Sequence, residues 1–249
     1  MRILSIGNSF SEDAQRWLHQ LSLCGDSVID AENLFIGGCS LETHCDCITN
    51  KKSDYDLQGN NIEHIRKVSV NEIIENEQFD VITIQQASGF SGIPQSYIPY
   101  VTEIADYVRK HQPNAKLYFH KTWSYDFDST HKHFAFYNNN QGEMFRRISD
   151  CAEMVKKLIN ADVLPVGDFI QYLRENTDEF NHANGGVSLC RDGFHLSLLY
   201  GRFVASAVWY KEIAGEYANI EKFSELNTQF DLNLLEIIVK NLKEFYSGR

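Results

Sequence analysis

Short apolar runs alternate with longer amphipathic stretches through most of this 249-residue chain. Five runs are candidate strands, at residues 3–6, up to 33–36, 81–84, 116–120 and 163–166. Between them, apolar residues recur at three- and four-residue spacing, which is typical of helices with one buried face. Strands that alternate with such helices predict a mainly parallel sheet with helices packed on it.

The helical pattern is strongest in five stretches, at about residues 12–24, 98–111, 141–160, 196–212 and 232–245. In the third of these, one face can be formed by six apolar residues, which we expect to pack on the sheet: Met144, Ile148, Cys151, Val155, Leu158 and Ile159. The polar stretch 50–61 is predicted to be a loop or a small hairpin, and 70–77 a helix. No repeat or linker divides the chain, so a single domain over residues 1–249 is the simplest organisation.

Charge, hydropathy and cysteine content together argue against a nucleic-acid partner, a membrane span and a disulfide-bonded secreted protein. Asp and Glu total 34 against 23 Lys and Arg, a formal net charge of −11, so a nucleic-acid partner is not expected. No apolar run approaches the length needed to span a bilayer, and the first residues lack the pattern of a signal peptide. The six scattered cysteines fit reduced thiols, so we expect a cytoplasmic protein unless a leader has been removed.

The first strand stops abruptly at Gly7-Asn8-Ser9-Phe10-Ser11. One interpretation is structural, because Ser9 or Ser11 can cap the helix that follows. The other is chemical, because a serine at the carboxyl end of a buried strand lies where open α/β sheets bind ligands. A serine nucleophile requires a base and an orienting acid to converge on it.

A second segment, Asp192-Gly193-Phe194-His195, supplies those two groups directly before an apolar helix. If Asp192 turns back to bind one imidazole nitrogen of His195, the other nitrogen can accept a proton from Ser9. The structural alternative is that Asp192 caps a turn and His195 is only the residue at the start of a helix.

Two further turns could bind an anionic oxygen. Gly37-Gly38 follows the second strand, and paired glycines can expose backbone N–H groups. Gln85-Gln86 follows the third, and a glutamine there can offer a side-chain amide. Either pair could equally be an ordinary turn or satisfy buried backbone groups.

Taken in order, Gly7-Asn8-Ser9, Gly37-Gly38, Gln85-Gln86 and Asp192-Gly193-Phe194-His195 resemble the sequence blocks of the SGNH (GDSL-like) hydrolases. The resemblance is greatest to the branch known as domain of unknown function 4886, and it extends from residue 3 to about residue 210. It implies a flavodoxin-like, three-layer α/β/α sandwich. It also implies esterase or lipase activity, which in many members removes acetyl groups from carbohydrates.

Carried over by position, Ser9 matches the nucleophile, His195 the general base and Asp192 the acid that orients it. The backbone N–H groups of Ser9 and Gly38 match the donors of the oxyanion hole. The chain departs from the superfamily at Asn8, which replaces an aspartate.

A second departure concerns the oxyanion hole. The chain has no G-x-N-D block after the third strand, so the side-chain donor to the oxyanion would be Gln85 or Gln86. Trp123 and Tyr97 are expected to bind substrate at the rim of the same site, although Trp123 could equally fill a hydrophobic gap.

The leading hypothesis is therefore a serine esterase acting on a small or carbohydrate-linked ester, such as an acetyl ester. The alternative is a non-catalytic flavodoxin-like module that binds a phosphate-containing ligand or a glycan. Neither the Cys39 to Cys47 cluster nor His131-Lys132-His133 has the paired spacing of a zinc site, so no metal and no cofactor is predicted. The sequence leaves the oligomeric state open.

Overall fold

The structure is a computed structural model that describes residues 1–60 and 64–248. Within these residues a seven-stranded sheet has the order β4-β3-β2-β1-β5-β6-β7. Its strands are β1 (Arg2–Gly7), β2 (Asp30–Phe35), β3 (Tyr55–Gln58), β4 (His64–Val68), β5 (Val81–Ile84), β6 (Lys116–His120) and β7 (Asp162–Leu164).

The five predicted strands correspond to β1, β2, β5, β6 and β7, which are parallel to one another. Their order β2-β1-β5-β6-β7 is the flavodoxin-like 2-1-3-4-5, so the predicted α/β/α class is confirmed. The predicted number of strands is wrong, because β3 and β4 extend the sheet as an antiparallel hairpin beyond β2. Most of β4 is exposed, so it has no apolar run to reveal it. Residue 61 of the predicted loop or hairpin lies outside the described residues.

The helices of the described chain are α1 (Ser9–Gln15), α2 (Leu18–Ser22), α3 (Leu41–Thr49), α4 (Val70–Asn76), α5 (Tyr100–His111), α6 (Gln141–Ile159), α7 (Val166–Asn176), α8 (Tyr200–Ala214), α9 (Ile220–Leu226) and α10 (Leu232–Ser247). The predicted helix at 12–24 is two helices, and the one at 196–212 begins later, at Tyr200. None of the described helices is both long and apolar enough to cross a bilayer.

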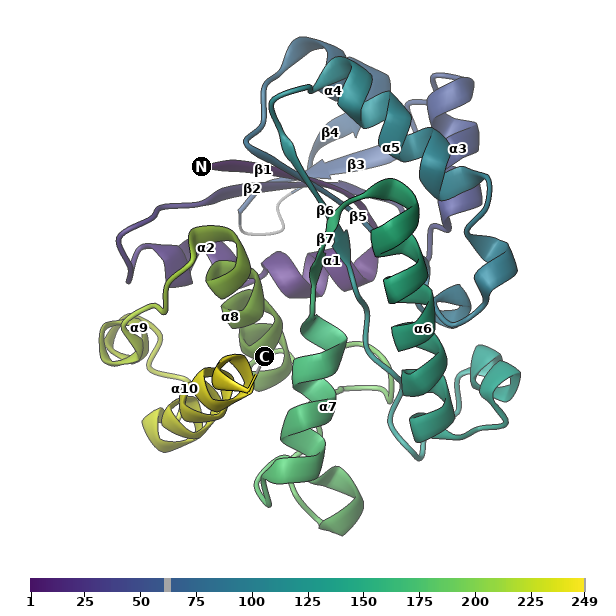
Figure 1. Cartoon of the computed structure of the whole chain (residues 1–249). Helices are drawn as coiled ribbons and strands as arrows, with labels where there is room; N and C mark the ends of the chain where they lie inside the picture. The colour runs from purple at the N-terminus through teal and green to yellow at the C-terminus, as the bar shows by residue number, and fades with distance from the viewer. Residues whose placement is uncertain (61–63, 249) are drawn as a thin grey trace.

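The helices form two layers, one on each face of the sheet (Figure 1). Successive residues of β1 point to opposite faces. Ile3 belongs to the core that includes residues of α1, α2, α7, α8 and α10, whereas Leu4 belongs to the core that includes residues of α3, α4 and α5. Helix α6 contributes to both cores. Its predicted buried face is confirmed except at Leu158, which is exposed. This arrangement leaves the turns after β1, β2 and β5 together at the carboxyl edge of the sheet.

Candidate active site

The structure brings Ser9, His195 and Asp192 together at the carboxyl edge of the sheet. Ser9 is the first residue of α1, directly after β1, and its Oγ lies 2.9 Å from Nε2 of His195. Nδ1 of His195 lies 2.7 Å from Oδ2 of Asp192. This is the geometry in which a serine, a histidine and an aspartate act as nucleophile, base and orienting acid.

The hydrogen bonds around Asp192 fix which imidazole nitrogen carries the proton. Oδ1 of Asp192 accepts the backbone N–H of His195 at 2.7 Å, so the carboxylate is clamped beside the ring. Partial burial opposes ionisation of Asp192, but the bonds from His195 outweigh it, and its pKa lies below the ordinary value. An ionised Asp192 accepts the proton of Nδ1, which leaves Nε2 to accept the hydroxyl proton of Ser9.

Asn8, rather than either serine, caps helix α1. Its side chain accepts the N–H of Phe10 at 3.0 Å, while Ser11 Oγ accepts the N–H of Asn8 at 3.1 Å and completes a capping box. The cap therefore uses Ser11 and leaves Ser9 Oγ to His195. The prediction that Ser9 or Ser11 is the N-cap is therefore wrong, because Asn8 takes that position and Ser11 only completes the box.

Asp192 and His195 lie on one loop, residues 190–196, which we call the histidine loop. Asp13, one turn after Ser9 on α1, is fully buried beneath this loop. Its Oδ2 accepts the N–H of Leu196 at 2.8 Å, and Arg191 donates to its Oδ1 at 3.0 Å. Arg202 of α8 donates to the same Oδ1 at 2.7 Å. Asp13 thus ties both ends of the histidine loop to the helix that carries Ser9.

Replacing Asp13 by asparagine should therefore damage both stability and activity. Because two arginines would lose their buried carboxylate, we expect the free energy of unfolding to fall by about 3 kcal/mol. We expect kcat for an ester to fall at least roughly 10-fold with little change in KM, because the base is displaced rather than the pocket. Urea unfolding and steady-state kinetics, at a temperature where the variant stays folded, measure the two effects.

The matched control is Asp150→Asn, which removes an exposed carboxylate paired with Arg146 on α6. A surface pair of this kind contributes about 0–1 kcal/mol, so this variant should behave as the wild type. Equal kinetic effects of the two substitutions would exclude a positioning role for Asp13.

Trp123 lies in the core rather than at the rim of the site. Its ring is fully buried and stacks on Phe10 at 4.1 Å, and its Nε1 donates to the carbonyl of Phe194 at 2.7 Å. The substrate-binding role expected for Trp123 is therefore corrected to a supporting one, between α1 and the histidine loop. Tyr97 is also corrected, because it is buried and donates to the carbonyl of Ser91.

The backbone N–H groups of Ser9 and Gly38 can donate hydrogen bonds to an anionic oxygen in the pocket. The N–H of Ser9 belongs to the first turn of α1, where helices have no intrahelical partner to offer. Gly38 has φ of +64°, a conformation that favours glycine, and among the described residues its N–H has no acceptor. Both residues line the same pocket.

The two glutamines are committed to other partners. The side-chain amide of Gln85 donates to Oδ1 of Asn8 at 2.5 Å. Its Oε1 lies 2.7 Å from Nδ1 of His120, and burial lowers the pKa of that histidine to about 3. Gln86 donates to Ser96 and accepts from the backbone. Neither glutamine lines the pocket, so the expected side-chain oxyanion donor is corrected. Gln85 instead supports the cap that holds Ser9 in place.

A pocket of about 360 Å³ opens beside Ser9. Its walls come from the turns after β1, β2 and β5, from η3 (Lys132–Tyr137) with the residue before it, and from the histidine loop. They are formed by Asn8, Ser9, Phe10, Gly37, Gly38, Ala87, Ser88, Gly89, Phe90, His131, His133, Phe194 and His195. The sequence predicts that the segment 89–94 forms a wall of the site, and Gly89 and Phe90 do line the pocket. Sequence reasoning missed His131 and His133 as wall residues, although their spacing was a visible signal.

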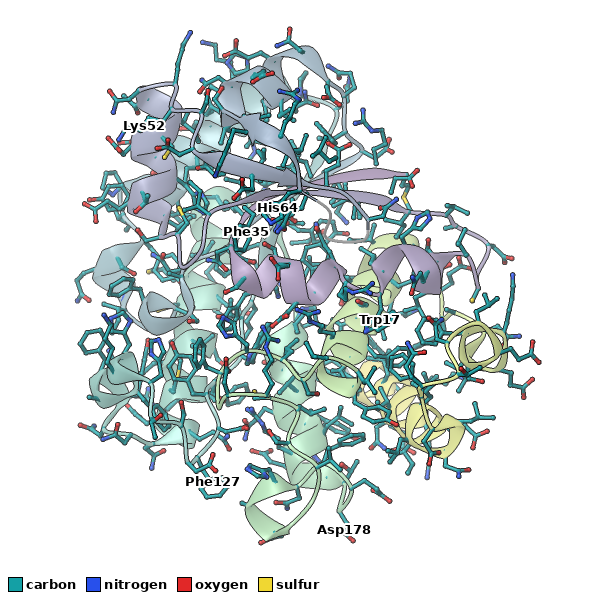
Figure 2. All side chains as sticks on the ribbon, turned by 180° about the vertical axis from the view of Figure 1, so that it is seen from behind. Trp17, Phe35, Lys52, His64, Phe127 and Asp178 are labelled. Atoms are coloured by element: carbon teal, nitrogen blue, oxygen red, sulfur yellow. The ribbon has the colours of Figure 1, made fainter. Side chains whose placement is uncertain are left out.

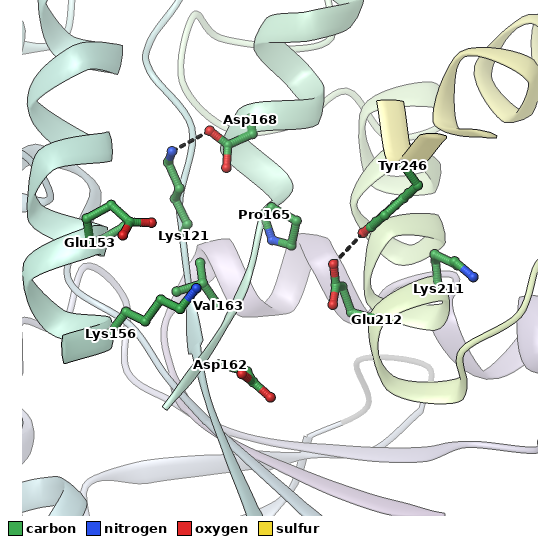
Figure 3. Close-up of a pocket in the computed structure, with 11 residues that line it drawn as sticks. Lys121, Glu153, Lys156, Asp162, Val163, Pro165, Asp168, Lys211, Glu212 and Tyr246 are labelled. Atoms are coloured by element: carbon green, nitrogen blue, oxygen red, sulfur yellow. Dashed lines mark hydrogen bonds and ion pairs between the residues drawn. The ribbon is translucent and has the colours of Figure 1, made fainter. Parts of the chain in front are cut away.

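A second cavity, of about 580 Å³, lies between α6, β7 and α8 (Figure 3). Lys121 forms an ion pair with Asp168 there, and the hydroxyl of Tyr246 donates to Glu212 at 2.8 Å. The described residues that line it include no serine, cysteine or histidine, so this cavity does not offer a serine or cysteine nucleophile with a histidine base.

One group of side chains in the described chain has metal-like spacing, formed by Asp126, Asp128 and His182. Asp126 already accepts from Arg174 at 2.6 Å and from Ser188 at 2.6 Å. Because the positive Arg174 already contacts the carboxylate of Asp126, this group does not suit a cation.

Fold and site together define a class, an α/β/α sandwich with serine, histidine and aspartate hydrogen-bonded at the carboxyl edge of a flavodoxin-like sheet. The chain belongs to the DUF4886 family, since the model of this domain of unknown function matches residues 2–229. The resemblance found in the sequence is thereby confirmed. No functionally curated protein matches the chain at a significant level.

Solved structures with this fold include a DUF4886 family protein from Bacteroides uniformis, with a TM-score of 0.79 and 32% identity over 87% of this chain and 83% of that one. A proposed SGNH hydrolase from Slackia heliotrinireducens has a TM-score of 0.59 and 18% identity, covering 85% of this chain and 97% of its own. An acetylxylan esterase from Geobacillus stearothermophilus has a TM-score of 0.55 and 11% identity, covering 88% of this chain and 96% of its own.

Proposed function

We propose that this protein is a serine esterase that hydrolyses a small or carbohydrate-linked ester, such as an acetyl ester. The observation that carries the proposal is a chain of two hydrogen bonds, from Ser9 Oγ to His195 at 2.9 Å and from His195 to Asp192 at 2.7 Å. Ser9 and His195 also line a pocket. The fold shared with an acetylxylan esterase is consistent with this chemistry.

In the proposed reaction, Ser9 Oγ attacks the ester carbonyl carbon while Nε2 of His195 accepts its proton. The N–H groups of Ser9 and Gly38 donate to the oxygen that becomes negative. The tetrahedral intermediate collapses, His195 protonates the leaving alcohol, and an acyl group remains on Ser9. Water then repeats the sequence, which releases the carboxylic acid and restores the serine.

The alternative is a module that binds a phosphate-containing ligand or a glycan without catalysis. Retention of a glycan without turnover would distinguish its glycan-binding form from an esterase. Its phosphate-binding form has less support. Among the described residues that line the pocket there is no lysine or arginine to neutralise a phosphate. A phosphate site also has no use for a histidine held between a serine and an aspartate.

The test is to incubate the protein with 4-nitrophenyl acetate and, separately, with an alkyl fluorophosphonate that labels activated serines. We expect turnover of the acetate and one adduct, on Ser9 within the tryptic peptide 3–16. Fragmentation of that peptide separates Ser9 from Ser5 and Ser11. Neither turnover nor adduct, or an adduct on another serine, would overturn the proposal.

A further inference from the structure

The pocket beside Ser9 has an unusual selection of polar groups. Its described lining residues include no lysine, arginine, aspartate or glutamate, and its ionisable groups are three histidines. One of these, His195, belongs to the relay. The other two, His131 and His133, are half-buried, and burial is the main cause that lowers the pKa of each below its ordinary value. Both imidazoles are therefore neutral near pH 7.

Neutral imidazoles offer donors and acceptors without charge. Nδ1 of His131 accepts the backbone N–H of His133 at 3.2 Å, so the proton of the neutral His131 ring lies on Nε2. For His133, neither ring nitrogen has a hydrogen-bond partner within the described part of the chain. Both rings thus retain polar atoms for a ligand that carries hydroxyl groups.

Aromatic rings hold the two imidazoles in place. His131 packs on Phe194 with ring centroids 4.6 Å apart, and His133 packs on Phe90 at 5.1 Å. Gly89 makes room for this arrangement, because a Cβ there would lie 2.1 Å from Nδ1 of His133. The wall therefore combines flat apolar faces with uncharged polar atoms, which is the combination that suits a ring bearing hydroxyl groups.

The position of this wall indicates which part of an ester it contacts. Phe194 precedes His195, with ring centroids 4.1 Å apart, and His131 lies against Phe194. His195 must protonate the leaving alcohol, so that alcohol lies on the histidine side of the pocket rather than beyond Gly38.

We propose that the leaving alcohol of the substrate is an uncharged, hydroxyl-bearing ring, such as a neutral pyranose, and that His131 and His133 determine this specificity. This inference rests on the proposed esterase function. A carboxylate on the ring would lose water without gaining a cationic partner among the described residues that line the pocket, because the neighbouring Lys132 is exposed and lies outside that lining. The net charge of −11 adds to its exclusion.

The test compares three acetate esters. Methyl 3-O-acetyl-glucopyranoside and methyl 3-O-acetyl-glucuronopyranoside have the same ring and differ in a hydroxymethyl group against a carboxylate. Ethyl acetate has no ring and measures the chemistry alone. We expect kcat/KM to be at least roughly 10-fold higher for the neutral glycoside than for the uronoside, and higher than for ethyl acetate.

Two variants test the wall itself. His133→Phe keeps a flat ring and removes its polar atoms, whereas Gly89→Ala keeps the imidazole and displaces it. In each, we expect the ratio of kcat/KM for the neutral glycoside to that for ethyl acetate to fall about 10-fold. The matched control is Phe127→Ala, since this exposed aromatic lies at the outer edge of the molecule (Figure 2), beside His182 and outside the pocket lining.

The outcomes separate this inference from the function on which it rests. Failure of all three esters, with no labelling of Ser9 by fluorophosphonate, would overturn the esterase proposal. Labelling of Ser9 with equal turnover of the neutral and anionic glycosides, or with an unchanged ratio in both wall variants, would overturn the specificity proposal alone. A thermal unfolding curve for each variant verifies that it is folded in the assay.

Discussion

Ser9→Ala should reduce ester hydrolysis by about 10⁴-fold or more. The hydroxyl of Ser9 is the group bonded to Nε2 of His195, and an alanine leaves that nitrogen without a nucleophile to activate. The residual rate would come from the N–H groups of Ser9 and Gly38 acting on water attack. Initial rates with 4-nitrophenyl acetate at saturating substrate measure the effect.

The control for this variant is Ser53→Ala, which changes an exposed serine between α3 and β3. It should retain full activity, and both proteins should unfold at nearly the same temperature as the wild type. A Ser9→Ala protein that keeps more than about a tenth of the wild-type kcat would exclude Ser9 as nucleophile.

Asp192→Asn should lower kcat by roughly 10⁴-fold, the size measured for the equivalent change in a serine protease. Asparagine presents an amide that can donate to Nδ1, which favours the imidazole tautomer with its proton on Nε2. Nε2 then cannot accept the proton of Ser9, although the geometry of the loop changes little.

A pH profile and a control sharpen this result. Above pH 5 the wild-type Asp192 is ionised, because its pKa is lowered from 3.8, so protonation of Asp192 does not limit the wild-type rate there and Asp192→Asn should be the slower protein at every such pH. Asp178→Asn alters an exposed carboxylate away from the site (Figure 2) and should leave kcat unchanged. Wild-type activity in Asp192→Asn would show that His195 needs no orienting carboxylate.

The sequence was informative about Ser9, Asp192 and His195 because each lies beside a strand end or helix start that the apolar pattern also marks. The same reasoning misplaced Trp123 and Gln85. Lying after the carboxyl end of a strand brings a residue near the site, but it does not determine which way its side chain points. Both point inward, toward hydrogen-bond partners from other elements.

Other features had only a weak local signal. The stretch 50–61 is predicted to be a loop or a small hairpin, but strands β3 and β4 are not recognised as part of the sheet. Half of β3 is polar although most of it is buried, and most of β4 is exposed, so neither strand has an apolar run. Asp13 resembles an ordinary acid in the first turns of a helix, and its partner Arg191 is 178 residues away. His131 and His133 were visible as a pair, but a role in a pocket wall depends on Gly89 and Phe90, which only the fold brings beside them.

The bond between Asp13 and Arg191 has a consequence for how the protein is made. Ser9 and His195 are 186 residues apart, so a ribosome must add the chain between them before the two can meet. Contacts that close so long a loop form late and slow folding. A nascent chain that ends before His195 therefore has Ser9 without its histidine, and the proposed esterase activity would report the fully folded state.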